Sequence, residues 1–89
     1  MSRDLTFTPT AWGEYLDWQK QDKKIFKKIN ELIKDIQRSP FDGLGKPEPL
    51  KENLAGFWSR EITKKHRIVY KVEKDNVRII QVENHYNDK

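Results

Sequence analysis

The sequence predicts an α+β domain in which two N-terminal helices pack on a mostly antiparallel sheet of four to five strands. Two segments with helical spacing of apolar residues cover 9–38, and three segments with alternating apolar residues cover 57–83. A short alternating piece at 5–7 adds an edge strand, so the expected order is β-α-α-β-β-β. With 89 residues, three Trp, three Tyr and four Phe, the chain is expected to form one domain, 1–89.

The first helix is expected to begin at Thr8 and Pro9. Threonine caps helix N-termini, and proline suits the first helical position because the amide hydrogen that it lacks would have no helical partner there. Apolar residues then recur at intervals of three and four: Ala11, Trp12, Tyr15, Leu16 and Trp18. This spacing predicts an amphipathic helix.

The second helix is expected to run from an N-cap at Asp22 to Ser39-Pro40, because the residue before a proline is displaced from helical geometry. Its apolar face is formed by Ile25, Ile29, Leu32, Ile33 and Ile36. Residues 20–38 carry seven Lys or Arg and three Asp or Glu, a net charge of +4 that equals the charge of the whole chain. A solvated helix face and an anion-binding stripe both account for this concentration of lysines.

Residues 41–56 are expected to form a long ordered loop, since they hold three of the four glycines and two of the four prolines. Long loops inside small domains are often functional. The Pro-Glu-Pro at 47–49 encloses Glu48, so this carboxylate has two rigid neighbours, with Lys46 and Lys51 on either side.

Three strands are expected after this loop, over 57–63, 66–73 and 77–83, with a turn at 74–76. The alternation along the first of them places three side chains on one side: Trp58, Arg60 and Ile62. A meander of this kind is antiparallel, because its strands follow one another through short connections.

Composition excludes several classes of chemistry. The absence of cysteine excludes disulfides, thiol nucleophiles, iron–sulfur clusters and cysteine-ligated zinc. The two histidines, His66 and His85, lack a helical metal-ligand spacing, and no metal or other cofactor is expected. Neither a signal peptide nor a membrane-spanning segment is recognisable, so a cytoplasmic protein is expected. The net charge of +4 favours a nucleic acid or an acidic protein as partner.

Without a thiol or a metal, catalysis would have to use acid–base groups, and the topology allows a few to meet. Glu48 precedes the first of the three strands, Arg67 opens the second, and His85 follows the third with Tyr86 next to it. In adjacent antiparallel strands the start of one lies beside the end of the next. A carboxylate base, a guanidinium and an imidazole acid are the minimal set for metal-free RNA cleavage at a 2′-hydroxyl.

Ordinary structural roles are an alternative for each of these groups. A glutamate in a loop is commonly a plain surface residue, and a histidine near a chain end is commonly idle. Arg67 is equally suited to an ion pair with Glu61 or Glu83, and His66 is expected to be structural or exposed. The residue pattern alone therefore leaves the catalytic interpretation open.

A resemblance to the YoeB/Txe toxins, a branch of the RelE-like ribonuclease toxins of bacterial toxin–antitoxin modules, is carried by the run KKINELIKDIQRSPFDGLGKPEPLKENLAGFWSREITKKHRIVYKVE. The similarity extends back through AWGEYLDWQ and forward to His85-Tyr86, so it covers nearly the whole chain without a gap. The specific elements are GKPEPLK, GFWSR followed by IT one residue later, HRIVY and the terminal His-Tyr.

The resemblance implies a RelE-like fold, related to the microbial ribonucleases. It implies a ribosome-dependent endoribonuclease that cuts mRNA in the A site of the 70S ribosome and so inhibits translation. The implied reaction is metal-independent and yields a 2′,3′-cyclic phosphate or a 3′-phosphate together with a 5′-hydroxyl. A cognate antitoxin similar to YefM or Axe is implied as the neutralising partner and as the only link to operator DNA, and a homodimer is compatible with the family.

By motif, the resemblance makes Glu48 the general base, Arg67 the phosphate-stabilising cation and His85 the general acid. Tyr86 is implied to help position the substrate. RNA contacts are implied for three further basic residues, Lys46, Lys51 and Arg60. A role in docking on ribosomal RNA is also implied for the lysines of the second helix: Lys23, Lys24, Lys27, Lys28 and Lys34.

Two features depart from the family pattern. Glu61 stands where the family commonly has a second arginine, so a cationic contact with RNA is absent or reversed in sign there. The chain also continues past His-Tyr with Asn87-Asp88-Lys89, which displaces the terminal carboxylate from Tyr86.

Two other functions stay open. One is a non-catalytic module that binds RNA or DNA through the basic helix, and the other is a degenerate toxin that only sequesters an antitoxin. A catalytic role for Glu48 separates the ribonuclease from both, because binding RNA does not require a carboxylate.

Overall fold

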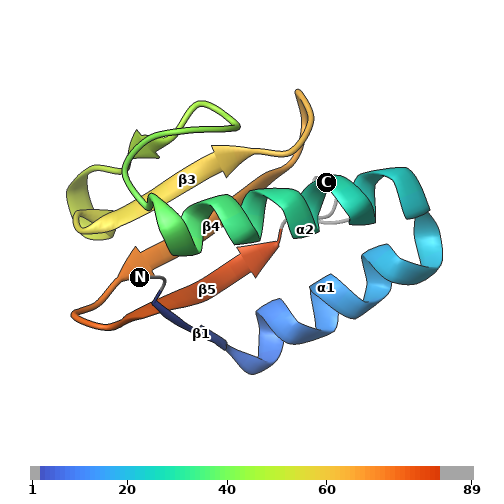
Figure 1. Ribbon diagram of the computed structural model, residues 1–89, viewed down its shortest axis with the longest axis horizontal. Helices are drawn as coiled ribbons and strands as arrows, with labels where there is room; N and C mark the ends of the chain where they lie inside the picture. The colour runs from blue at the N-terminus through green and yellow to red at the C-terminus, as the bar shows by residue number, and fades with distance from the viewer. Residues whose placement is uncertain (1–2, 83–89) are drawn as a thin grey trace.

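The computed structural model describes residues 3–82 as a five-stranded mixed sheet with two helices on one of its faces (Figure 1). The elements in chain order are β1 (Asp4–Phe7), α1 (Pro9–Gln21), α2 (Lys23–Arg38), β2 (Glu48–Pro49), the 3₁₀ helix η1 (Glu52–Leu54), β3 (Phe57–Glu61), β4 (Arg67–Val72) and β5 (Asn76–Val82). The strands lie in the order β1-β5-β4-β3-β2, with β1 parallel to β5 and the other pairs antiparallel. The predicted α+β architecture is confirmed, and the short β2 supplies the fifth strand.

Local sequence signals set the ends of both helices. Thr8 caps α1, and its Oγ1 accepts a hydrogen bond from the Ala11 amide at 3.2 Å, with Pro9 at the first helical position. Asp22 serves both helices, since its amide donates to the Trp18 carbonyl and its carboxylate caps α2 by accepting from Ile25 N. These predicted boundaries are confirmed. Neither helix within residues 3–82 is long and apolar enough to span a membrane.

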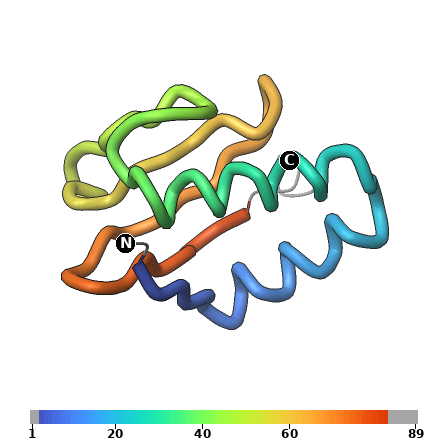
Figure 2. Tube along the Cα trace, in the orientation of Figure 1, coloured from blue at the N-terminus to red at the C-terminus, as the bar shows by residue number. Residues whose placement is uncertain are grey.

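The core lies between the helices and the sheet. The helices run antiparallel to each other across the same face of the sheet (Figure 2). Four of the five residues on the predicted apolar face of α2 are buried, Ile29, Leu32, Ile33 and Ile36, and the fifth, Ile25, is partly buried against them. The sheet contributes Ile68, Tyr70, Val77, Ile79 and Val82, and Ile62 joins them directly after the end of β3. His66 is also buried, with its ring 5.0 Å from that of Trp18. Of the two roles expected for His66, structural or exposed, the structure therefore shows the structural one.

A β-bulge changes the alternation along β5. Val69 pairs with Gln81 whereas its neighbour Tyr70 pairs with Ile79, so Ile80 is the extra residue on β5. As a result Ile79 and Val82 both face the core although they are an odd number of residues apart. Without the bulge, Gln81 would face the core in place of Val82.

Candidate active site

Glu48 lies on the edge strand β2 rather than in the loop that the sequence predicts. It pairs with Ser59 of β3, and the Leu50 amide donates to the Phe57 carbonyl at 2.9 Å. Because successive amides of a strand point in opposite directions, the nitrogen of Pro49 faces away from β3. Proline has no N–H to offer there, so this edge is a poor template for a further strand.

Glu48 and Arg67 meet on the face of the sheet that is opposite the helices. Arg67 Nη1 lies 3.8 Å from Glu48 Oε1, although the two residues belong to strands separated by β3. The side chains are 61% exposed for Glu48 and 44% exposed for Arg67, so both groups are accessible to a substrate. Among the described residues Arg67 thus pairs with Glu48 and not with Glu61, the alternative partner that the sequence suggested.

Ser59 fills the space between these two charged residues. Its side chain is buried, and its Oγ accepts a hydrogen bond from Arg67 Nη1 at 3.3 Å. Sequence reasoning did not single out Ser59. The available signal was the strand alternation, which puts Ser59 on the opposite side from Trp58 and Arg60.

A second pair of charges lies beside the first. Glu61 is the direct cross-strand neighbour of Arg67, and Lys46 Nζ lies 4.0 Å from Glu61 Oε1. The backbone of Lys46 has a positive φ of 53°, which turns the chain into β2. Positive and negative side chains therefore alternate over the open face, with Lys46 beside Glu61.

Lys51 follows the end of β2 by two residues. It is exposed and occupies the N-cap position of η1, where its carbonyl accepts from the Leu54 amide at 3.0 Å. Lys51 therefore stays close to Glu48 along the chain, on an exposed segment.

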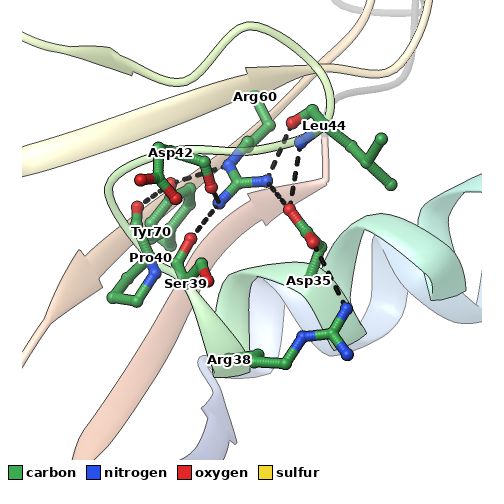
Figure 3. Close-up of polar contacts among 8 residues, drawn as sticks. All are labelled: Asp35, Arg38, Ser39, Pro40, Asp42, Leu44, Arg60 and Tyr70. Atoms are coloured by element: carbon green, nitrogen blue, oxygen red, sulfur yellow. Dashed lines mark hydrogen bonds and ion pairs between the residues drawn. The ribbon is translucent and has the colours of Figure 1, made fainter.

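Arg60 does not face this surface, and the RNA contact expected of it is wrong. Strand alternation directs Arg60 to the helix side of β3, and its side chain is completely buried. A guanidinium has five N–H donors, and five hydrogen bonds use them (Figure 3). The acceptors are Tyr70 Oη at 3.1 Å, Asp35 Oδ2 at 2.7 Å, and the carbonyls of Leu44 at 2.8 Å, Ser39 at 2.5 Å and Asp42 at 3.0 Å.

The Arg60 cluster holds the segment that leads from α2 to Glu48. The hydrogen bond from Arg60 lowers the pKa of Asp35, against the effect of burial, and the amide of Leu44 also donates to this carboxylate. Burial raises the pKa of Tyr70, whose hydroxyl donates to the Pro40 carbonyl at 2.6 Å. Residues 39–44 are thus attached to both the sheet and α2 by charge-assisted hydrogen bonds.

The basic residues of α2 lie in the other layer of the molecule. All five lysines proposed for docking are exposed: Lys23, Lys24, Lys27, Lys28 and Lys34. Three of them line a hollow of about 470 Å³ between α2 and the loop at Leu44 and Gly45. These ammonium groups belong to the helix layer, whereas Glu48 and Arg67 occupy the open face of the sheet.

His85 and Tyr86 lie outside the described residues, as does Glu83. Within the described residues, Ile68 pairs with Val82. The described part of β5 therefore ends beside the first residues of β4, where Arg67 stands. This is the strand arrangement on which the predicted meeting of the catalytic groups depends.

Comparison with known proteins assigns the chain to a family. The family described as "YoeB-like toxin of bacterial type II toxin-antitoxin system" matches residues 7–86. Toxin YoeB of Escherichia coli K12 is 57% identical over 82 residues, which cover 92% of this chain and 98% of that protein.

Solved structures agree with this assignment. A YoeB/ParE toxin from Agrobacterium tumefaciens has a TM-score of 0.88 at 47% identity and covers 93% of this chain and 99% of its own. A YoeB dimer and a heterotetrameric YoeB–YefM complex, both from Staphylococcus aureus, each have a TM-score of 0.86 at 45% identity and cover 97% of this chain and 100% of their own. The chain therefore belongs to the YoeB-like toxins of bacterial type II toxin–antitoxin systems.

Proposed function

We propose that this toxin is a ribosome-dependent endoribonuclease that cleaves mRNA in the ribosomal A site and so inhibits translation. The observation that carries the proposal is the 3.8 Å approach of Arg67 to Glu48 on an accessible sheet face, in a chain of the YoeB-like family. A carboxylate beside a guanidinium supplies a base and a cation at the same phosphodiester.

The proposed reaction is a transesterification that needs no metal. Glu48 takes the proton of the ribose 2′-hydroxyl, and the 2′-oxygen forms a bond to the adjacent phosphorus. The bond from phosphorus to the 5′-oxygen breaks, and His85 donates a proton to that leaving oxygen. The products are a 2′,3′-cyclic phosphate, which water can open to a 3′-phosphate, and a 5′-hydroxyl. Tyr86 is proposed to position the substrate.

Arg67 is proposed to stabilise the charge that develops on the phosphoryl oxygens. Its contact with Glu48 is long for an ion pair, and both side chains are largely exposed. Exposed pairs of this kind contribute about 0–1 kcal/mol, so the guanidinium can turn from the carboxylate to a phosphate at little cost. Ser59 supports this arrangement, since its hydroxyl accepts from the same Nη1.

RNA binding is proposed to use two separate surfaces. Lys46 and Lys51 lie near Glu48 and are suited to contact the mRNA backbone, whereas the lysines of α2 are suited to ribosomal RNA phosphates on the other layer. Phosphate contacts release counterions, so binding to the ribosome should weaken steeply as salt rises.

The proposed protein partner is an antitoxin similar to YefM, which neutralises the toxin and alone connects it to operator DNA. The heterotetrameric YoeB–YefM complex and the YoeB dimer of the Staphylococcus aureus relatives support an antitoxin complex and a homodimer for this chain. A cytoplasmic location follows from the proposed ribosomal target.

The decisive experiment compares wild-type protein with Glu48→Gln on ribosomes programmed with a defined mRNA. Glu48→Gln keeps the shape of the side chain and removes the base, so cleavage and growth arrest should be lost while the thermal unfolding transition is kept. Glu52→Gln, which alters an exposed glutamate of η1, is the matched control and should cleave normally.

The two alternative functions give different results in this assay. A non-catalytic binding module would inhibit translation equally well with Gln at position 48 and would leave the mRNA intact. A degenerate toxin would bind its antitoxin yet produce no cut ends even as the wild-type protein. Full activity of Glu48→Gln would move the base to another residue.

A further inference from the structure

Strand β5 extends beyond its neighbour β1, and Thr8 together with side chains of α1 covers the described part of the remaining edge. The pairing of β1 with β5 ends at Phe7 and Ile79. The next hydrogen bonds to this edge come from Thr8, whose amide donates to the Ile79 carbonyl at 3.0 Å and whose hydroxyl donates to the Ile80 carbonyl at 3.3 Å. Beyond the end of β1, the residues at the start of α1 therefore provide the hydrogen bonds to the edge of β5.

Val82, the last described residue of β5, is held on both of its backbone polar groups. Its amide donates to Glu14 Oε1 at 2.8 Å, and its carbonyl accepts from Trp18 Nε1 at 3.4 Å. Glu14 and Trp18 are four residues apart on α1, so they lie on the same face of the helix. We call these two contacts the Val82 clamp.

The carboxylate of the clamp is placed where packing alone would favour an apolar side chain. Glu14 is only 8% exposed and stands among the residues of α1 that face the sheet. A buried carboxylate is costly unless hydrogen bonds compensate it. An apolar residue would fill this space but would leave the Val82 amide without its acceptor.

We propose that Glu14 is a positioning residue for the reaction, with Trp18 as its partner, and that the Val82 clamp fixes the end of the described part of β5. The inference rests on the proposed function, because His85 is the proposed acid and follows Val82 by three residues. The bulge at Ile80 contributes, since it determines that Val82 rather than Gln81 faces α1. A displacement of about 1 Å of a catalytic group can cost on the order of 10²-fold in rate.

The test compares Glu14→Leu, which removes the acceptor, with Glu14→Gln, which keeps a side-chain oxygen in the same position. Two quantities are measured for the full chain: the hydrogen exchange of the Val82 amide, and single-turnover cleavage of ribosome-bound mRNA over a range of ribosome concentrations. Ile36→Val, a buried change in α2 away from the clamp, controls for a general loss of stability.

For Glu14→Leu we expect the Val82 amide to exchange at least about tenfold faster and the maximal cleavage rate to fall by about 10²-fold, with the half-saturating ribosome concentration within about threefold of wild type. Glu14→Gln should stay close to wild type in both Val82 exchange and cleavage rate, and Ile36→Val should change neither quantity. Wild-type cleavage by Glu14→Leu, or a loss of cleavage equal in Glu14→Gln and Glu14→Leu, would overturn the positioning role.

The two proposals fail in different ways. If wild-type protein does not cleave, the ribonuclease proposal falls, whereas the exchange comparison still decides whether Glu14 holds the end of β5. Unchanged Val82 exchange in a folded Glu14→Leu protein would overturn the clamp even if cleavage were lost.

Discussion

Arg60 of β3 and Asp35 of α2 form an ion pair inside the protein, with Nη1 and Oδ2 2.7 Å apart and the arginine fully buried. The pair connects the helix layer to the sheet, and through the carbonyls of residues 39–44 it also fixes the segment that leads to Glu48 (Figure 3). Its contribution is therefore both to stability and to the placement of the proposed base.

Removing the arginine should be strongly destabilising. Arg60→Met deletes five hydrogen bonds and leaves the Asp35 carboxylate without its main partner, which should cost about 3–5 kcal/mol in the free energy of unfolding. Urea denaturation measures this change. Arg38→Met is the matched control, because Arg38 reaches the same carboxylate at 3.6 Å with a side chain that is 76% exposed, and its loss should cost less than about 1 kcal/mol.

Stability should fall in acid with a contribution that belongs to Asp35. Arg60 lowers the pKa of Asp35 in the folded protein, so the unfolded chain binds its proton first as the pH falls. The stabilisation is present above the ordinary aspartate pKa of about 3.9 and is lost as the pH falls through the lower pKa of the folded protein. Urea denaturation across this window should show a smaller pH slope for Asp35→Asn than for wild type. Equal slopes would contradict the assignment.

Glycine-to-alanine changes should rank by backbone conformation and available space. At Gly45, φ is +77° and a Cβ would lie 2.8 Å from Leu32 Cδ2 and 3.0 Å from the Glu61 carbonyl oxygen, so Gly45→Ala should cost more than about 2 kcal/mol. Gly56→Ala meets no atom within 4 Å but has φ +94°, so only the backbone penalty of about 1–2 kcal/mol applies. Thermal unfolding should give this order.

Gly13→Ala is the reference in the same series. Gly13 lies within α1 and a Cβ there would meet nothing within 4 Å. The substitution should stabilise the protein by about 0.5–1 kcal/mol, since alanine loses less conformational freedom in a helix. Destabilisation by Gly13→Ala would contradict the open space that the structure shows around Gly13.

His85→Ala should slow the chemical step if His85 is the general acid. The expected loss is on the order of 10²–10⁴-fold in the single-turnover rate, the usual contribution of a positioned acid. The affinity for ribosomes should stay unchanged, as measured by sedimentation. A loss below tenfold would assign the leaving-group proton to another residue, with Tyr86→Phe as the next variant to measure.

Glu61→Arg should strengthen binding to the programmed ribosome. The change removes the carboxylate that holds Lys46 and adds a cation directly opposite Arg67. The half-saturating ribosome concentration should fall, and the dependence of binding on salt should become steeper, because more phosphate contacts release more counterions. Binding that is unchanged at every salt concentration would mean that this part of the sheet does not approach RNA.

The helices were predictable because their signals are local. The cap at Thr8 bonds to Ala11, and the cap at Asp22 bonds to Ile25, both within three residues along the chain. The strands of the meander were equally predictable from alternation. The same alternation also indicates a buried position for Arg60, because it shares its side of the chain with Ile62, a core residue, and Trp58, which packs against the core.

The site was only partly predictable, since its geometry depends on which strands become neighbours. Glu48 was expected in a loop because it sits between two prolines, which are unusual in strands. It joins the sheet because β2 is an edge strand, where an outward-facing proline nitrogen has no partner to lose. The roles of Ser59 and Glu14 could not be predicted, because neither belongs to a sequence motif and both interact with residues far away along the chain.

Periodicity, capping residues and motif spacing thus suffice for the architecture of this toxin and for a short set of chemical groups, since each depends on residues within a few positions of one another. The burial of Arg60 against Asp35, 25 positions away, and the grip of Glu14 on Val82, 68 positions away, follow from packing α1 and α2 on one side of the sheet. Strand register and that packing determine which polar groups are enclosed and which reach solvent, and burial changes the energy of a charged group far more than sequence context does.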